Sequence, residues 1–116
     1  TTSTSLVDFT GATLTLTTGA NPVLVGLASS CQNNTANANI NYSVDVDGTN
    51  ELGTGGIAFN ADVADQQQDC SFSMMTSDLT AASHTIKLEW STSAGTATTE
   101  CNTSVPCNFW VVEVTD

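Results

Sequence analysis

Apolar and polar residues alternate with a period of two in short runs along the whole chain. In the clearest run, residues 40–47 read INYSVDVD, so that every second side chain is apolar. This period is typical of a β-strand with one face on the core and the other toward solvent. The expected strands are residues 6–9, 13–17, 23–27, 40–47, 57–59, 70–74, 84–90, 96–99 and 109–115.

Turn-forming residues separate these runs. Glycine occurs in Asp47-Gly48, in residues 53–56 and in Ala94-Gly95, where turns commonly need it. Residues 61–68 are the one segment that could form a helical turn. About eight to ten strands at this spacing predict an all-β, antiparallel sandwich or barrel. The length of 116 residues and the lack of a linker indicate a single domain, residues 1–116.

The last expected strand is apolar on both faces. Trp110, Val112 and Val114 point to one side, and Phe109 and Val111 point to the other. A sandwich strand has one face on the core, so the second face needs another cover. We expect an oligomer interface at Phe109 and Val111. The alternative is that the loop between Cys101 and Cys107 covers Phe109.

The charge balance narrows the classes of partner. The chain has 12 acidic residues, one basic residue (Lys87) and a formal net charge of −11. Nucleic-acid binding is excluded, because phosphate neutralisation needs basic side chains. Adsorption to an anionic membrane is disfavoured for the same reason. The chain has no apolar run of about 18 residues that could span a membrane. Solubility, cation binding or a basic partner remain as reasons for the charge.

Four cysteines, at Cys31, Cys70, Cys101 and Cys107, lack the C-x-x-C spacing of zinc sites. An even number predicts disulfides, with three possible connectivities. We favour Cys101–Cys107 as a local clamp and Cys31–Cys70 as a long-range tie. Disulfides imply an oxidising compartment, so we expect an extracellular protein.

Three N-x-S/T sequons are glycosylation candidates, at Asn33, Asn41 and Asn102. The motif is short, and chance matches are common in a chain rich in Asn and Thr. Asn33 and Asn102 are the better candidates, because both are expected in loops beside cysteines.

The final third of the chain has a familiar order of segments: SHTIKLEW at 83–90, AGTAT at 94–98 and FWVVEV at 109–114. It resembles the jelly-roll domains of phage and viral fibre, spike and capsid-decoration proteins, which share their shape with tumour-necrosis-factor-like domains. The resemblance implies a jelly roll of about eight to ten strands, a homotrimer and a virion-surface location. The four cysteines and three sequons are uncommon in phage fibres. A virus of an archaeal or eukaryotic host, or a cellular surface protein, therefore remains an alternative.

Catalytic chemistry finds little support. A Ser or Cys nucleophile needs a neighbouring base, and the one histidine, His84, shares a strand face with Ile86 and Leu88. We expect its imidazole to be buried or half-buried and hydrogen-bonded, and the protein not to be an enzyme.

Calcium is the one cofactor that the residues suggest. Asp45, Asp47 and Asn50 place oxygen ligands close together, as a hard cation prefers. The alternative is an ordinary Asp47-Gly48 hairpin turn without metal.

The expected function is a virion-surface structural protein, namely a spike, fibre tip or capsid decoration, in particle assembly or host attachment. Its partners would be copies of itself, other virion proteins, or a host receptor or glycan. An extracellular adhesion or glycan-binding module is the first alternative, and a major coat subunit is the second. A glycan-binding module should show an exposed aromatic platform, whereas we expect Trp90 and Trp110 to be buried.

Overall fold

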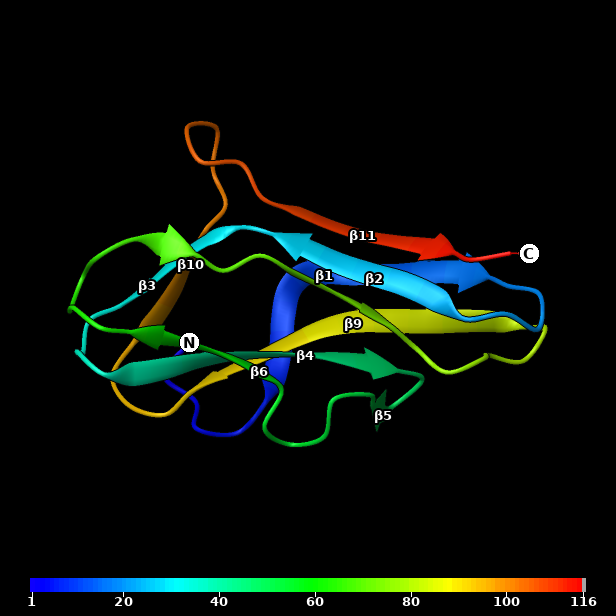
Figure 1. The fold of residues 1–116 in the computed structure, drawn as a ribbon, viewed down its shortest axis with the longest axis horizontal. Helices are drawn as coiled ribbons and strands as arrows, with labels where there is room; N and C mark the ends of the chain where they lie inside the picture. Colours follow the sequence, from blue (N-terminus) through cyan, green and yellow to red (C-terminus); the bar gives the residue numbers. More distant parts are fainter. Residues whose placement is uncertain (116) are drawn as a thin grey trace.

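The computed structural model describes residues 1–115, which form β-strands and no helix (Figure 1). The strands are β1 (Val7–Thr17), β2 (Val23–Ala28), β3 (Ser30–Asn33), β4 (Ala38–Val46), β5 (Thr49–Asn50), β6 (Ile57–Ala61), β7 (Gln68–Asp69), β8 (Phe72–Met75), β9 (Ser83–Thr92), β10 (Ala97–Glu100) and β11 (Asn108–Glu113). The predicted all-β fold with antiparallel sheets is confirmed.

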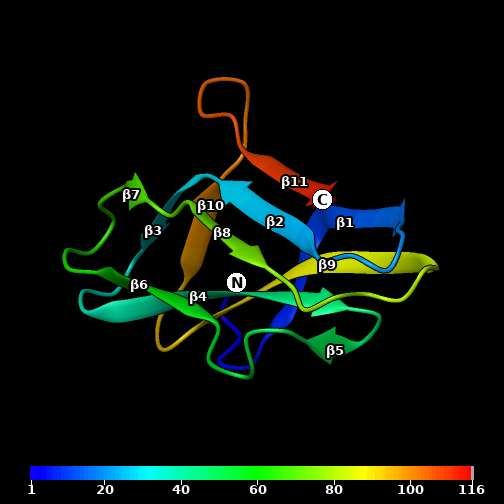
Figure 2. The same cartoon turned by 45° about the vertical axis from the view of Figure 1, so that its right-hand side comes forward.

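The strands form two layers (Figure 2). One layer is the sheet of order β1-β9-β4-β5, with β6 also paired to β4. The other layer contains the sheets β11-β2-β8 and β10-β3-β7. These two sheets adjoin, because the chain passes directly from β2 into β3. The molecule measures 44 × 29 × 22 Å.

Two local expectations were wrong. The expected strands 6–9 and 13–17 are one strand, β1, whose register against β9 shifts between Asp8 and Thr13. Gly11 lies within this bulge at φ 86°, a conformation that glycine adopts without steric cost. The expected helical turn at 61–68 is irregular instead, between the end of β6 and the start of β7. The Asp65 N–H donates to the Asn33 carbonyl, so this segment lies along the edge of β3.

The Asp47-Gly48 turn has the predicted form. Asp45 pairs with Asn50 and Val46 with Thr49, which leaves a two-residue hairpin loop. Asp47 and Gly48 both have positive φ, at 52° and 86°, as this tight hairpin requires.

The core consists of two apolar clusters between the layers. Tyr42 is fully buried at the centre of the first, with ring centroids 5.9 Å from Phe59, 6.1 Å from Phe72 and 6.4 Å from Trp90. Its hydroxyl is hydrogen-bonded to Thr99, so its one polar atom has a partner inside the core. Burial raises the pKa of the Tyr42 hydroxyl.

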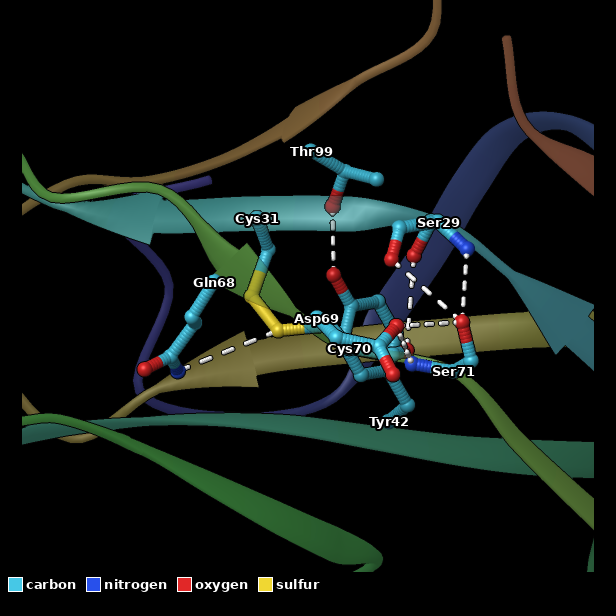
Figure 3. Close-up of a disulfide and its surroundings, with 8 residues drawn as sticks. All are labelled: Ser29, Cys31, Tyr42, Gln68, Asp69, Cys70, Ser71 and Thr99. Carbon is cyan, nitrogen blue, oxygen red and sulfur yellow. Dashed lines mark hydrogen bonds between the residues drawn. A yellow bond between two sulfur atoms is a disulfide. The ribbon is translucent and has the colours of Figure 1, made fainter. Parts of the chain in front are cut away.

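Both favoured disulfides are present. Cys31 and Cys70 are fully buried beside Tyr42 and tie β3 to the segment before β8 (Figure 3). Cys101 and Cys107 close a loop between β10 and β11 that projects from the body of the sandwich (Figure 1). Within residues 1–115 no helix is long and apolar enough to cross a membrane.

Candidate functional site

The last strand, β11, lies at the edge of its sheet and has one face on the core. Phe109 and Val111 are half-buried and pack against the core clusters. They pair with Leu27 and Val25 of β2, whose side chains are buried. The expectation that Phe109 and Val111 form an exposed interface is therefore corrected, because their side chains are directed inward.

The opposite side of the sheet carries a continuous apolar surface. Leu24 of β2 pairs with Val112 on one side and with Met75 on the other, so the three side chains form a row across the sheet. Trp110 of β11 and Val114, which follows β11, extend this row along the strand direction. The exposed fractions are 55% for Met75, 53% for Val112 and 37% for Val114. We call these five residues the Trp110 face.

Trp110 lies flat on the sheet because its neighbour on β2 is a glycine. Gly26 pairs directly with Trp110, and a Cβ at Gly26 would overlap the indole ring. Trp110 is therefore only partly buried. Trp90 and Trp110 were both expected to be buried, and both are only partly buried. Trp90 packs against the core with its ring 4.8 Å from that of Phe9, whereas Trp110 lies on the outward side of the sheet.

The Trp110 face carries no charge, although the chain has a net charge of −11. The other outward positions of the three strands are Gly26, Ala28, Ser73 and Asn108. The acid of β11, Glu113, instead accepts hydrogen bonds from the Gly19 N–H at 2.6 Å and the Asn21 amide at 2.8 Å. A partner of either charge can therefore approach this face without local repulsion.

A polar hollow of about 530 Å³ lies on the other sheet, against the N-terminal segment. It is lined by Thr4, Ser5, Leu6, Asn50, Thr54 and Glu89. The Glu89 carboxylate accepts a hydrogen bond from the Asn50 amide at 2.7 Å. The hydroxyls and this carboxylate could hydrogen-bond a small polar ligand, but no aromatic ring lines the hollow for a sugar to stack on.

The predicted calcium ligands serve the protein's own hydrogen bonds. Asp45 accepts from the Gly48 N–H at 2.9 Å, and Asp47 accepts from the Thr85 N–H at 2.8 Å. Asn50 accepts from the Leu52 N–H at 3.2 Å and from the Ser43 hydroxyl. These contacts explain the turn without a cation, and the calcium site remains a prediction.

His84 is 7% exposed, and both ring nitrogens have partners, as expected for a satisfied imidazole. Nε2 lies 2.9 Å from the Thr80 carbonyl, and Nδ1 lies 2.6 Å from the Asp47 carboxylate. Because both partners are acceptors, the protonated ring satisfies both contacts. The Thr80 carbonyl, and then Asp47, raise the pKa of His84. Hydrogen bonds from the Thr85 N–H, and then from His84, lower the pKa of Asp47.

The three sequons differ in access. Asn33 is fully buried, and its amide nitrogen donates to the Thr92 hydroxyl at 2.8 Å and the Ala94 carbonyl at 3.1 Å. A glycan on this nitrogen has no room in the fold, so Asn33 is corrected as a candidate. Asn41 is half-buried and donates to Ser91. Asn102 is exposed in the projecting disulfide loop, where a glycan fits.

The sequence did not identify Leu24 and Met75 as part of the exposed apolar face. It also placed the interface on the side of β11 that carries Phe109 and Val111, which faces the core. A signal was present in Gly26, because a glycine inside an apolar strand often marks the close approach of another group. Only the register between β2 and β11 shows that this group is the Trp110 ring.

Comparisons with protein-family models, curated proteins and solved structures found no match to the chain.

Proposed function

We propose that the chain is an extracellular structural module of a virion surface, such as a spike, fibre tip or capsid decoration, which binds a neighbouring protein of the particle through the Trp110 face. The observation that carries the proposal is that face, which is apolar and uncharged on an otherwise acidic chain. Exposed apolar patches of this kind are typical of protein interaction sites. The two disulfides are compatible with an oxidising, extracellular location.

We do not retain the homotrimer interface that the sequence predicted. Phe109 and Val111, the expected oligomer interface, pack on the core. The contact is assigned instead to Trp110, Val112 and the residues beside them.

Immunogold labelling with an antibody to the folded domain tests the location. We expect label on the surface of intact particles released by the source. Label confined to the cell interior would contradict the proposal.

The role of the Trp110 face is tested by comparing Val112→Glu with Val63→Glu, because Val63 is 55% exposed and lies outside the sheet. We expect Val112→Glu to reduce incorporation into particles and Val63→Glu to leave it unchanged.

Glycan binding is the second candidate, and the Trp110 ring favours it. An indole lying flat and partly exposed on a sheet is a surface on which a sugar can stack. A glycan array probed with the wild-type domain and with Trp110→Ala separates the two candidates. Binding that is lost in Trp110→Ala would favour the adhesion role over the assembly role.

A further inference from the structure

We propose that the free edge of β11 pairs with β11 of a second copy of this chain, which joins two sandwiches through one continuous sheet. The proposal goes beyond the proposed function and does not require a particle. Strand β11 is the terminal strand in the order β11-β2-β8, and Figures 1 and 2 both show it on the rim of the molecule.

The backbone groups needed for such pairing are directed outward. The Val114 N–H donates to the Pro22 carbonyl at 3.0 Å, and antiparallel ladders alternate between bonded and non-bonded residue pairs. Val112 and Trp110 therefore bond to β2. The N–H and C=O groups of Phe109, Val111 and Glu113 face the free edge.

This edge lacks the features that commonly block edge pairing. Residues Asn108–Glu113 contain no proline or lysine, and their register with β2 is continuous. By contrast, β1, an edge strand of the other sheet, has a bulge between Asp8 and Thr13. Bulges, prolines and charges are the usual protections of an edge strand. The one charge in β11, Glu113, is held by Gly19 and Asn21.

The core is incompletely covered beside the same edge. A groove of about 310 Å³ lies between β1 and the start of β11, with Phe9, Leu14, Leu27 and Phe109 among its lining residues. Phe109 is only half-buried although it faces the core. A strand added to β11 would lie over this side of the sandwich and cover apolar surface that the monomer leaves open.

A second copy is the occupant that the surface favours. The Trp110 face spans three strands, two of 6 residues and one of 4, which gives on the order of 300 Å². A stable interface needs roughly 800 Å² per partner. An antiparallel pair centred on Val111 places Trp110 opposite Val112 of the other copy. It also joins two Trp110 faces into one surface of about twice the area. Because the one charged side chain of β11, Glu113, is bound by Gly19 and Asn21, two copies of an acidic chain can pair along this edge.

The experiment is sedimentation equilibrium of the purified protein across a wide range of concentration, with three variants. Val112→Glu places a charge beside the paired edge and should weaken dimerisation at least about tenfold, because the charge would lose solvation in the dimer. Met75→Glu is the matched control, since it has the same exposure on the same face but lies on β8, away from the edge. It should leave the dimer unchanged. Val111→Pro removes an N–H that faces outward and should abolish pairing.

Amide hydrogen exchange gives a readout independent of whether Val111→Pro folds. In the wild type, exchange at Phe109 and Val111 should slow as the concentration rises, while the exposed Thr103 amide should not change. A wild-type protein that is monomeric at every concentration would overturn the inference. Equal loss of dimer in Val112→Glu and Met75→Glu would also overturn it, because that result indicates face-to-face packing. Neither outcome depends on where the protein resides.

Discussion

The ring of His84 and the carboxylate of Asp47 are joined at 2.6 Å across the end of the β4–β9 pair. Asp47 belongs to the hairpin turn after β4, and His84 to the start of β9. The second ring nitrogen lies 2.9 Å from the Thr80 carbonyl. The pair therefore holds the turn, the strand and the preceding loop together, and its strength depends on protonation.

The first prediction is a stability maximum at mildly acidic pH. The pKa of His84 is raised above 6.5 in the folded protein, so its contribution is complete below pH 6.5 and is lost as the pH rises through the folded value. The pKa of Asp47 is lowered below 3.8, so its contribution is complete above pH 3.8 and is lost as the pH falls through the folded value. Thermal unfolding measured from pH 2 to pH 9 should show a decline above pH 6.5 and a second decline below pH 3.8.

His84→Gln is the control for this prediction, because it should remove the decline above pH 6.5. The Thr1 amino group also titrates in this range. Burial lowers its pKa from 8.0, which makes stability rise with pH, opposite in sign to the histidine effect. Subtracting the variant's profile from the wild-type profile isolates His84. An unchanged slope in His84→Gln would show that the pair does not control the pH dependence.

The second prediction concerns the glycine under the indole. Gly26→Ala should lower the free energy of unfolding by about 1–3 kcal/mol, because the added methyl group overlaps the Trp110 ring. Fluorescence should show greater exposure of this tryptophan. Gly55→Ala is a suitable control, since nothing lies within 4 Å of its Cβ position. Combining Gly26→Ala with Trp110→Ala should recover part of the loss if the two side chains are coupled.

The third prediction separates the two disulfides. Cys31 and Cys70 are 39 residues apart, and a loop of this length predicts a loss of about 4 kcal/mol on replacement of both by serine. Cys101 and Cys107 are 6 residues apart, for which the same relation gives about 2 kcal/mol. Urea unfolding of the two double variants measures both values. Mass spectrometry after mild reduction should show the exposed Cys101–Cys107 bond opening first.

The fourth prediction contrasts two sequon asparagines. Asn33→Ala should cost about 1–3 kcal/mol, because the buried Thr92 hydroxyl loses the amide that donates to it and the contact to the Ala94 carbonyl is also lost. Asn102→Ala should cost less than about 1 kcal/mol, since its contacts are exposed to water. In a glycosylating host, peptide mapping of the folded protein should find any glycan at Asn102 and none at Asn33. A glycan on folded Asn33 would contradict its burial.

Much of the fold follows from local patterns in the sequence. Alternation identified the two faces of β9, with His84, Ile86 and Leu88 directed inward. The Asp47-Gly48 pair predicted the tight hairpin, because few residues tolerate positive φ at two successive positions. The even number of cysteines and their spacing favoured the disulfides that the structure contains. These features depend on neighbouring residues or on simple chain geometry, so sequence reasoning can reach them.

The candidate site depended on contacts between distant residues. Alternation shows that β11 has two apolar faces, but only its pairing with β2 decides that Phe109 and Val111 face the core and Trp110 faces outward. The polar residue Asn33 was expected in a loop, yet it is buried because Thr92 and Ala94 supply its hydrogen bonds. The sequence by itself therefore determined most of the strands and their two faces, but neither β3 nor the continuity of β1. The tertiary structure decided which face is covered, because burial depends on what the opposite layer places against each strand.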